Sequence, residues 1–391
     1  MQIIRGIYTA FKREVIAIIR DRLYLISLVV LPVVMMLFFM VFFAHGSIDN
    51  LPIAVVDNDH SAMSRRLTTM IDATRGVEVA MSANSTREAQ AEVLKGEIYG
   101  FVVVPRGFES GIIGGEPQIV DVVISGANLS AAGILRSNIQ ESVTTLSSGV
   151  AISKLRAMGV GEHEVMSDVM PINALTHIVA NPYLNYGYYL APMFMFVGVV
   201  VFTMLLSIYA VGRELRYGTA CEWLTSASDS LFVALVGKLL PVTIVMTLIM
   251  GLIYALLTFV MGMAFCGSTL LLMLISLLFI LAYQTIAIAI VAITANMRLA
   301  LSLGGGYAVM AFTFSGITFP TIAMYGVAQV LSHIFPFTYF SKFFINYALF
   351  GADISYSSID IMYIVAFILT VALSWRRLDR VVRNSEYWGR D

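Results

Sequence analysis

Charged residues are scarce in this chain of 391 residues. Only 13% of the residues are Asp, Glu, Lys or Arg, whereas 59% are hydrophobic. Soluble globular proteins carry roughly 25% charged residues. A chain this apolar has too few polar side chains to cover a water-facing surface, so the composition indicates an integral membrane protein. The net charge of −1 gives no electrostatic reason to expect nucleic acid as a partner.

Cysteine is also scarce, because Cys221 and Cys266 are the only two. The topology argued below places them on opposite faces of the membrane, where they cannot pair. The sequence therefore predicts no disulfide framework.

The chain lacks the motifs of an ATP-hydrolysing enzyme. No G-x-x-x-x-G-K-[ST] motif occurs, and Gly237-Lys238 is followed by Leu239 within an apolar run. No nucleophile–base pair stands out, so we expect no catalytic residue. If this protein uses ATP, we expect ATP and Mg²⁺ to bind to a partner ATPase, and no cofactor to bind to this chain.

Six apolar stretches have roughly the 20 residues that a membrane-spanning helix needs. They are residues 23–44, 186–211, 231–261, 268–293, 299–320 and 359–375. The first is longer than the roughly 7–15 apolar residues of a secretory signal, and "FFAHGS" is a poor cleavage site. We therefore predict that it is retained as a membrane anchor.

A further apolar segment, 325–350, is interrupted by His333, Pro336 and Lys342. If it crossed the membrane, the chain would have seven spans and its ends would lie on opposite sides. Basic residues cluster at both ends: Arg5, Lys12, Arg13, Arg20 and Arg22, and Arg376, Arg377, Arg380, Arg383 and Arg390. Cytoplasmic segments are enriched in such residues, so we predict two cytoplasmic ends and six spans. Residues 321–355 are then re-entrant or interfacial helices on the outer side.

This topology places the loop 212–230 in the cytoplasm and the polar segment 46–182 outside, which in a bacterium is the periplasm or cell surface. Strand-like runs alternate with helical patterns from "LPIAVVD" to "PQIVDVVIS", which predicts an α/β domain. The expected fold is thus an all-α transmembrane domain with an inserted extracytoplasmic α/β domain. Its expected parts are a helix at 1–22, a span at 23–45, the external domain at 46–182 and the remaining spans at 183–391.

"DNDHSAM" resembles the start of a calcium loop, since Asp57, Asp59 and Ser61 have the first three ligand offsets. Ala62 replaces the turn glycine and Thr68 replaces the bidentate Glu. We therefore expect no metal site, and instead a turn in which Asp59 or Ser61 caps a helix.

Residues 2–20 have an apolar stripe at helical spacing opposite Arg5, Lys12, Arg13 and Glu14. This pattern favours a helix lying in the membrane interface. The alternative is a docking surface for a cytoplasmic partner.

Charged residues are nearly absent from the predicted spans. Lys238 and Asp360 lie near the starts of the third and sixth spans, from which they are expected to reach the interface. Buried ionisable groups usually mark ion or proton pathways, so their scarcity disfavours a secondary transporter. A second alternative is a membrane-anchored receptor or scaffold with an external ligand-binding domain, which needs fewer than six spans.

Several separated stretches resemble the membrane subunit of an ABC-2 type (type V) ABC transporter, in the branch with a large external domain between spans one and two. These stretches are the N-terminal helix, "IAVVDNDHSAMSRRL", "NPYLNYGYYLAPMF", "RELRYGTACEWL" and "SGITFPTIAMYGVAQVLSHIFPFTYF". The resemblance implies an exporter permease in the bacterial inner membrane that pairs with a second copy or a paralogue. It also implies two cytoplasmic ATPase subunits, with a periplasmic adaptor as a further possible partner.

The resemblance also implies two sets of site residues. Contact with the ATPase is expected from the coupling loop, at Arg213, Glu214, Arg216, Gly218, Thr219 and Glu222. An outer gate is expected at Ser315, Gly316, Phe319, Pro320 and Pro336. Cys221 stands where the family has a second Glu, with Glu222 one position later. We expect Glu214→Ala to uncouple ATP hydrolysis from substrate while leaving folding intact.

Overall fold

The computed structural model describes residues 2–44, 46, 48–158 and 185–389. The chain divides into two compact units, one formed by Met1–Gly46 with Ile178–Asp391 and the other by Ser47–His177. We call them the membrane unit and the sheet unit.

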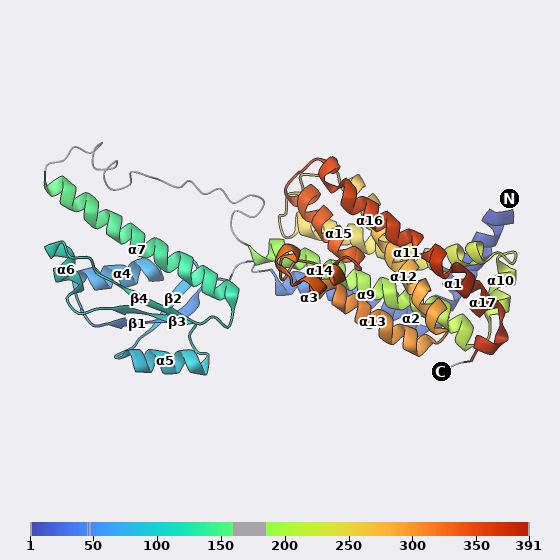
Figure 1. Cartoon of the computed structure of the whole chain (residues 1–391), viewed down its shortest axis with the longest axis horizontal. Coiled ribbons are helices and arrows are strands. Elements are labelled where there is room, and N and C mark those ends of the chain that lie inside the picture. Colours follow the sequence, from blue (N-terminus) through green and yellow to red (C-terminus); the bar gives the residue numbers. More distant parts are fainter. Residues whose placement is uncertain (1, 45, 47, 159–184, 390–391) are drawn as a thin grey trace. The chain divides into compact units, whose positions relative to one another are not determined.

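The sheet unit contains four strands: β1 (Leu51–Asp57), β2 (Val77–Ser82), β3 (Gly100–Val104) and β4 (Asp121–Ile124). Their order is β2-β1-β3-β4, and β1 runs parallel to both neighbours whereas β4 runs antiparallel to β3. The helices are α4 (Ala62–Asp72), α5 (Thr86–Lys95), α6 (Phe108–Gly114) and α7 (Leu129–Ala157). Figure 1 shows α4 and α7 on one face of the sheet and α5 on the other.

Alternating side chains of the strands explain these two layers. Ile53 and Val55 of β1 belong to the core beneath α4, α6 and α7, whereas Ala54 and Val56 belong to the core beneath α5. Successive residues of a strand point to opposite faces, so an unbroken apolar run indicates a sheet that is covered on both sides. The strands and helices predicted for this segment are present.

The "DNDHSAM" turn has the capping role that the sequence predicts. Ser61 accepts a hydrogen bond from the Ser64 amide and caps α4. Asp59 accepts hydrogen bonds from the backbone amides of Gly107 and Glu109, at 2.8 and 3.0 Å, and so holds the start of α6. The Ser61 side chain and these amides stabilise the charged carboxylate, which lowers the pKa of Asp59 below its ordinary value. Within the described residues, no group of three or more His, Cys, Asp or Glu is arranged to hold a metal ion.

The membrane unit is helical. Its longer helices are α1 (Gln2–Arg20), α3 (Leu31–Phe42), α9 (Tyr186–Arg216), α11 (Leu231–Phe259), α12 (Thr269–Thr294), α13 (Met297–Thr313), α16 (Ser358–Leu369) and α17 (Val371–Arg383). Short helices join them: α2 (Arg22–Leu25), η1 (Ile26–Val30), α10 (Ala220–Ser226), η2 (Thr321–Ala323), α14 (Gly326–Ser332), α15 (Pro336–Phe343), η3 (Phe344–Leu349), η4 (Ile354–Ser357) and η5 (Ser385–Tyr387).

Five of the described helical stretches are long and apolar enough to cross a membrane, by length and composition. They are Arg22–Phe42, Gly187–Arg216, Leu231–Phe259, Thr269–Thr294 and Ile354–Arg383. The predicted span 299–320 is shorter in the structure, because α13 ends at Thr313. Gly316 has a φ of +89° and Pro320 follows, so the helix does not continue through this stretch. At 1.5 Å per residue, the 17 residues of α13 extend roughly 25 Å.

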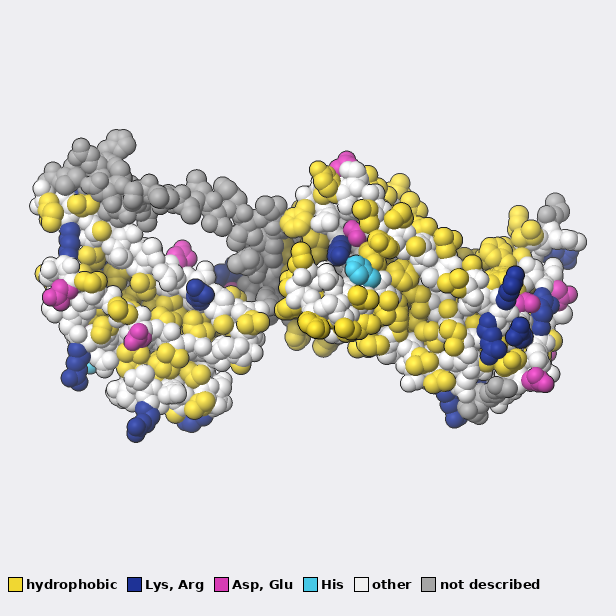
Figure 2. All heavy atoms as spheres, viewed as in Figure 1, with side chains coloured by type: hydrophobic (Ala, Val, Ile, Leu, Met, Phe, Trp, Pro, Cys, Tyr) yellow, Lys and Arg dark blue, Asp and Glu magenta, His cyan; other side chains and the backbone are white. Residues whose placement is uncertain are grey.

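The two ends of the membrane unit differ in composition. Figure 1 shows α1, α10 and α17 at one end, and α14 and α15 at the other. In Figure 2, basic side chains gather at the end where α1, α10 and α17 lie, and hydrophobic side chains dominate the surface between the ends. At the opposite end, seven of the eight residues of α15 are buried. The apolar segment 325–350 is therefore a set of short packed helices.

The buried face of α1 differs from the stripe that the sequence suggests. Gly6, Ala10, Glu14 and Ile18 are buried, whereas Ile4 and Tyr8 are exposed. A Cβ atom added at Gly237 of α11 would lie 2.6 Å from Ala10 Cβ and 2.7 Å from the Ile7 carbonyl oxygen. The two helices therefore approach closely along small residues. Glu14, which the periodicity assigns to the polar side, lies within this contact.

Candidate coupling site

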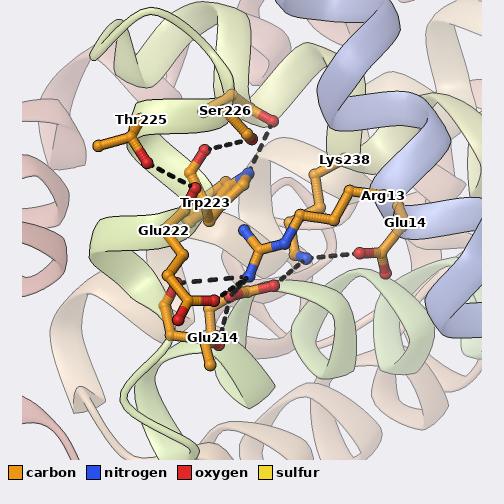
Figure 3. A network of polar contacts seen from close by, with 10 residues as sticks. Arg13, Glu14, Glu214, Glu222, Trp223, Thr225, Ser226 and Lys238 are labelled. Atoms are coloured by element: carbon orange, nitrogen blue, oxygen red, sulfur yellow. Dashed lines mark hydrogen bonds and ion pairs between the residues drawn. The ribbon is translucent and has the colours of Figure 1, made fainter.

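Three charged side chains from three helices meet in the interior of the membrane unit. They are Glu14 of α1, Glu214 near the end of α9, and Lys238 of α11, and each residue is at most 5% exposed. Lys238 Nζ lies 2.5 Å from Glu14 Oε2 and 2.7 Å from Glu214 Oε1 (Figure 3). One ammonium therefore joins the N-terminal helix to the end of a long apolar helix.

Glu214 has two further partners on its other carboxylate oxygen. Arg13 Nη2 donates to Glu214 Oε2 at 3.0 Å, and the Thr219 hydroxyl donates to the same oxygen. Arg13 also lies 3.7 Å from Glu222 Oε2 of α10. These contacts tie the turn between α9 and α10 to α1. We call Arg13, Glu14, Glu214 and Lys238 the charge cluster.

The charge cluster has two positive and two negative side chains, so its formal charges cancel. Removing charges from water costs several kcal/mol per ion, and only close opposite charges and hydrogen bonds offset that cost. Losing one partner of a buried pair therefore costs more free energy than the intact pair contributes to the stability of the fold. The consequence is a fixed geometry between the helices that supply the charges.

Tyr24 extends this network to the start of the first long apolar stretch. Its hydroxyl donates to Glu14 Oε1 at 2.9 Å, and its ring packs edge-on against Tyr209 of α9 at 5.0 Å between centroids. The Tyr209 hydroxyl in turn donates to Asp21 at 2.6 Å. This hydrogen bond lowers the pKa of Asp21 below its ordinary value. The junction between α1 and α2 is thereby fastened to α9.

Trp223 anchors α10 to α11. Its indole N–H donates to the Ala234 carbonyl oxygen at 3.1 Å, and Lys238 Nζ lies 5.3 Å from the centre of its ring. Trp223 is 1% exposed, whereas Cys221 and Glu222 on the same helix are exposed. The short helix α10 therefore has one face fixed on the bundle and another that faces outward.

The end of α17 and the segment after it also hold this region. Arg383 Nη2 donates to the Asp229 carbonyl oxygen, and the Gly389 amide donates to the Leu215 carbonyl oxygen, both at 3.0 Å. A Cβ atom added at Gly218 would lie 3.9 Å from the Trp388 ring. The last residue of α17 thus contacts the turn after α10, and the segment that follows α17 contacts the turn before α10.

The structure brings together only some of the residues that the resemblance assigns to ATPase contact. Glu214, Thr219 and Glu222 meet around Arg13, whereas Arg213 lies 5.9 Å over the Tyr209 ring. Gly218 forms the turn with a φ of +69°, and Arg216 lies 5.8 Å over the Tyr217 ring. The loop expected at 212–230 begins later, because α9 continues to Arg216.

Sequence reasoning missed Arg13, Glu14, Lys238 and Trp223 as members of this site. Lys238 is 1% exposed, so the expectation that it reaches the interface is wrong. The nearby acids Glu14 and Glu214 stabilise its charge in the interior, which removes the need to reach water. The available signal was a lysine within an apolar run, together with an acid on the small-residue face of the first helix.

The residues expected at the outer gate lie at the opposite end of the membrane unit from α1 and α10. The Ser315 hydroxyl donates to the Phe312 carbonyl oxygen at 2.6 Å, and Tyr189 donates to the Ile317 carbonyl oxygen. A Cβ atom added at Gly316 would lie 2.7 Å from Thr321 Cγ2. Phe319 is 53% exposed. Pro336 is the first residue of α15, where its missing N–H costs nothing.

A family model described as "ABC-2 family transporter protein" matches residues 22–376 of the chain. A search of curated proteins and a search of solved structures returned no match.

Proposed function

Because the chain belongs to the family of ABC-2 transporter proteins, we propose that it is the permease subunit of an ATP-driven exporter. Family membership makes it a multi-pass membrane component of a transporter, with ATP hydrolysis in a partner ABC ATPase. The proposal adds the direction of transport, a dimeric assembly with a second copy or a paralogue, and coupling through the surface around α10.

One observation carries the coupling proposal. The charge cluster joins α1, α9 and α11, and Arg13 and Trp223 connect it to α10, whose Cys221 and Glu222 face outward. An ATPase that contacts this exposed face applies its displacement to a helix that is fastened to two long apolar helices. Removing one partner of a buried ion pair costs about 3–5 kcal/mol, so separating one of these helices from the others would be costly.

The proposed topology has six spans, with α13 as the fifth, and both chain ends in the cytoplasm. The basic side chains at the end with α1, α10 and α17 support this orientation (Figure 2). The sheet unit then lies outside the cytoplasm, where a periplasmic adaptor is one candidate partner. We propose that the membrane that the chain crosses is the bacterial inner membrane.

The cargo we propose is hydrophobic or amphipathic. The helix α9 contains Met193, Met195 and Phe196, which are packed in the core of the membrane unit, and methionine is a side chain that repacks around varied apolar groups. Packing between helices accounts for the same side chains, so this support is weaker than that for coupling.

Co-purification and flux test the proposal together. The chain is purified in mild detergent with the ATPase encoded beside its gene, and the complex is reconstituted into proteoliposomes. We expect a stable complex and a flux of amphipathic dye that requires ATP. A chain that binds no ATPase, or a flux that is indifferent to ATP, contradicts the proposal.

The buried acids favour one competing function. Glu14 and Glu214 are ionisable side chains of the kind that mark proton routes in membrane proteins. A secondary transporter would show flux driven by a proton gradient in the absence of ATP. The same proteoliposomes, with an imposed gradient and no nucleotide, distinguish this function from the exporter.

A further inference from the structure

A pocket of about 580 Å³ opens beside the charge cluster, at the junction of α1, α2 and α9. Four arginines line it: Arg13, Arg20, Arg22 and Arg213. Asp21 is the one acidic residue among the lining side chains. The lining therefore has a formal charge of +3, from four positive groups and one negative group. We call it the arginine pocket.

The single acidic residue in this lining, Asp21, already accepts hydrogen bonds from other parts of the chain. Asp21 accepts hydrogen bonds from the Tyr209 hydroxyl and from the backbone amides of Leu23 and Tyr24. Arg13 is shared with Glu214 and Glu222. Among the described residues, Arg20 and Arg22 form no ion pair. The described part of the chain therefore leaves most of the pocket's positive charge without a matching anion.

Two guanidinium nitrogens of this lining lack an acceptor. Arg13 Nη1 and Arg213 Nη1 are buried, and neither has a hydrogen-bond partner among the described residues. Buried N–H groups are rarely left unpaired in folded proteins, and each exception calls for an explanation. A planar guanidinium matches the oxygen geometry of phosphate, so a phosphate in this pocket would offer acceptor oxygens to the arginines that carry these nitrogens.

The surroundings of the pocket indicate which anion it takes. Leu23 belongs to the lining and is 77% exposed, and Ile16 and Ile19 on α1 are 40% and 63% exposed. Arg22 begins the apolar stretch Arg22–Phe42. A basic amphipathic helix followed by an apolar stretch lies at a bilayer surface. The ligand that offers a phosphate beside apolar chains at that level is a phospholipid.

We propose that the arginine pocket binds the phosphate of an anionic phospholipid headgroup, with the acyl chains beside Leu23 and Ile16. Basic pockets near the ends of membrane helices recognise headgroups by this chemistry. The inference needs only that this end of the membrane unit lies at a bilayer surface. It does not depend on the direction of transport or on ATP.

Lipid titration of the full-length protein tests the site. The protein in mild detergent is titrated with short-chain phosphatidylglycerol, and binding is followed by native mass spectrometry. Short-chain phosphatidylcholine tests whether binding depends on the net charge of the headgroup. Inorganic phosphate tests whether the pocket binds a free anion as well as it binds a lipid. The variants are Arg213→Gln and Arg20→Gln, and the matched control is Arg380→Gln, an exposed arginine of α17 outside the pocket.

We expect saturable binding of phosphatidylglycerol that weakens about tenfold in each pocket variant and is unchanged in Arg380→Gln. A tenfold loss corresponds to about 1.4 kcal/mol, the scale of one hydrogen bond to a charged group. Arg20 is exposed, so its variant remains informative if Arg213→Gln fails to fold.

Three outcomes overturn the proposal. Equal weakening in Arg380→Gln assigns the binding to general surface charge. Inorganic phosphate that competes as well as the lipid identifies a site for a free anion. Loss of the ATPase in Arg20→Gln, with lipid binding unchanged, identifies an acidic protein segment as the occupant. Co-purification of the ATPase with the unaltered protein is scored separately, so failure of the lipid site leaves the exporter proposal standing.

Discussion

The ammonium of Lys238 lies 2.7 Å from the carboxylate of Glu214, and both side chains are nearly inaccessible to solvent. Glu14 completes the arrangement from the first helix, at 2.5 Å from the same nitrogen. Ion pairs at exposed positions contribute about 0–1 kcal/mol, because water solvates the separated charges well. The buried arrangement of Glu14, Glu214 and Lys238 differs from such exposed pairs, since loss of any of its three side chains leaves an uncompensated charge in the interior.

Lys238→Met is therefore expected to destabilise the protein by about 3–5 kcal/mol, because it leaves two buried carboxylates without their shared cation. Thermal unfolding in detergent measures the effect. Adding Glu14→Gln to this variant is expected to restore much of the lost stability, since Glu214 retains Arg13. A single variant that melts like the unaltered protein contradicts the pairing.

Variants at Glu214 and Glu222 distinguish a role in stabilising the fold from a role in docking the ATPase. Glu214→Gln is expected to lower stability by about 3 kcal/mol, because Lys238 and Arg13 lose a buried counter-charge. This revises the sequence-based expectation that a Glu214 variant leaves folding intact. Glu222 has a side chain that is 77% exposed and contacts only Arg13 among the described charged residues, so Glu222→Lys is expected to lower stability by about 1 kcal/mol, much less than Glu214→Gln.

The proposed docking surface predicts that Glu222→Lys weakens retention of the ATPase far more than it lowers the melting temperature. Pull-down of the partner at matched protein amounts measures retention, and thermal unfolding serves as the control. Full retention in Glu222→Lys would remove this face of α10 from the contact.

Gly237 provides a test of the packing between α1 and α11. Gly237→Ala is expected to cost about 1–3 kcal/mol, because the new methyl meets backbone atoms of α1 that cannot rotate away. Gly305→Ala is the matched control, since its Cβ would meet only Leu205 at an ordinary 3.8 Å. Melting temperatures of the two variants decide the point, and equal values would refute the close approach.

The hydrogen bonds of Asp59 predict that the local stability of the sheet unit depends on pH. Its pKa in the folded state is lowered from the ordinary value of 3.8, first by Ser61 and then by amides of α6. A lowered folded-state pKa means that the stabilisation is fully present above pH 4 or so and is lost as the pH falls through the folded-state value. Hydrogen exchange of the Gly107 and Glu109 amides, corrected for the intrinsic rate, is expected to show falling protection below that pH.

Asp59→Asn is the control for this pH dependence. The variant keeps one acceptor oxygen but cannot gain a charge, so its protection at these amides is expected to be lower at neutral pH and to change less on acidification. A variant with the same pH profile as the unaltered protein would assign the dependence to another group.

The two cysteines test the proposed topology. Cys221 and Cys266 are both exposed, and six spans place them on opposite sides of the membrane. In the Cys221→Ser variant, a membrane-impermeant maleimide is expected to label Cys266 from outside the cytoplasm. In the Cys266→Ser variant, Cys221 is expected to react only in inverted vesicles. Labelling of both from one side rules out this topology.

Much of the fold was predictable from the sequence, because its signals are local. Apolar runs of about 20 residues identify spans without reference to any neighbour. The unbroken run "LPIAVVD" likewise indicates a strand covered on both faces, and β1 has that environment. The end of α13 was predicted less well, because the turn at Gly316 interrupts an apolar run whose composition does not change.

The candidate site could be predicted only in part. Glu214 and Glu222 lie in a visibly polar stretch, but Glu14 precedes Glu214 by 200 positions and Lys238 follows it by 24. Spacing along the sequence contains no information about such a meeting. Periodicity also assigned Glu14 to the polar side of α1, because the residues that make its true packing face, Gly6 and Ala10, are small and only weakly hydrophobic.

By itself, the sequence determined that this is a membrane protein with a polar α/β insertion and a charged patch after its second apolar run. Those properties follow from composition and local periodicity, which act on each segment separately. Only the tertiary structure decided which charges are buried together, that Lys238 stays inside, and that Arg213 lines the arginine pocket whereas Glu214 pairs with Lys238. The physical reason is that the cost of burying a charge depends on its neighbours in space, and folding supplies those neighbours.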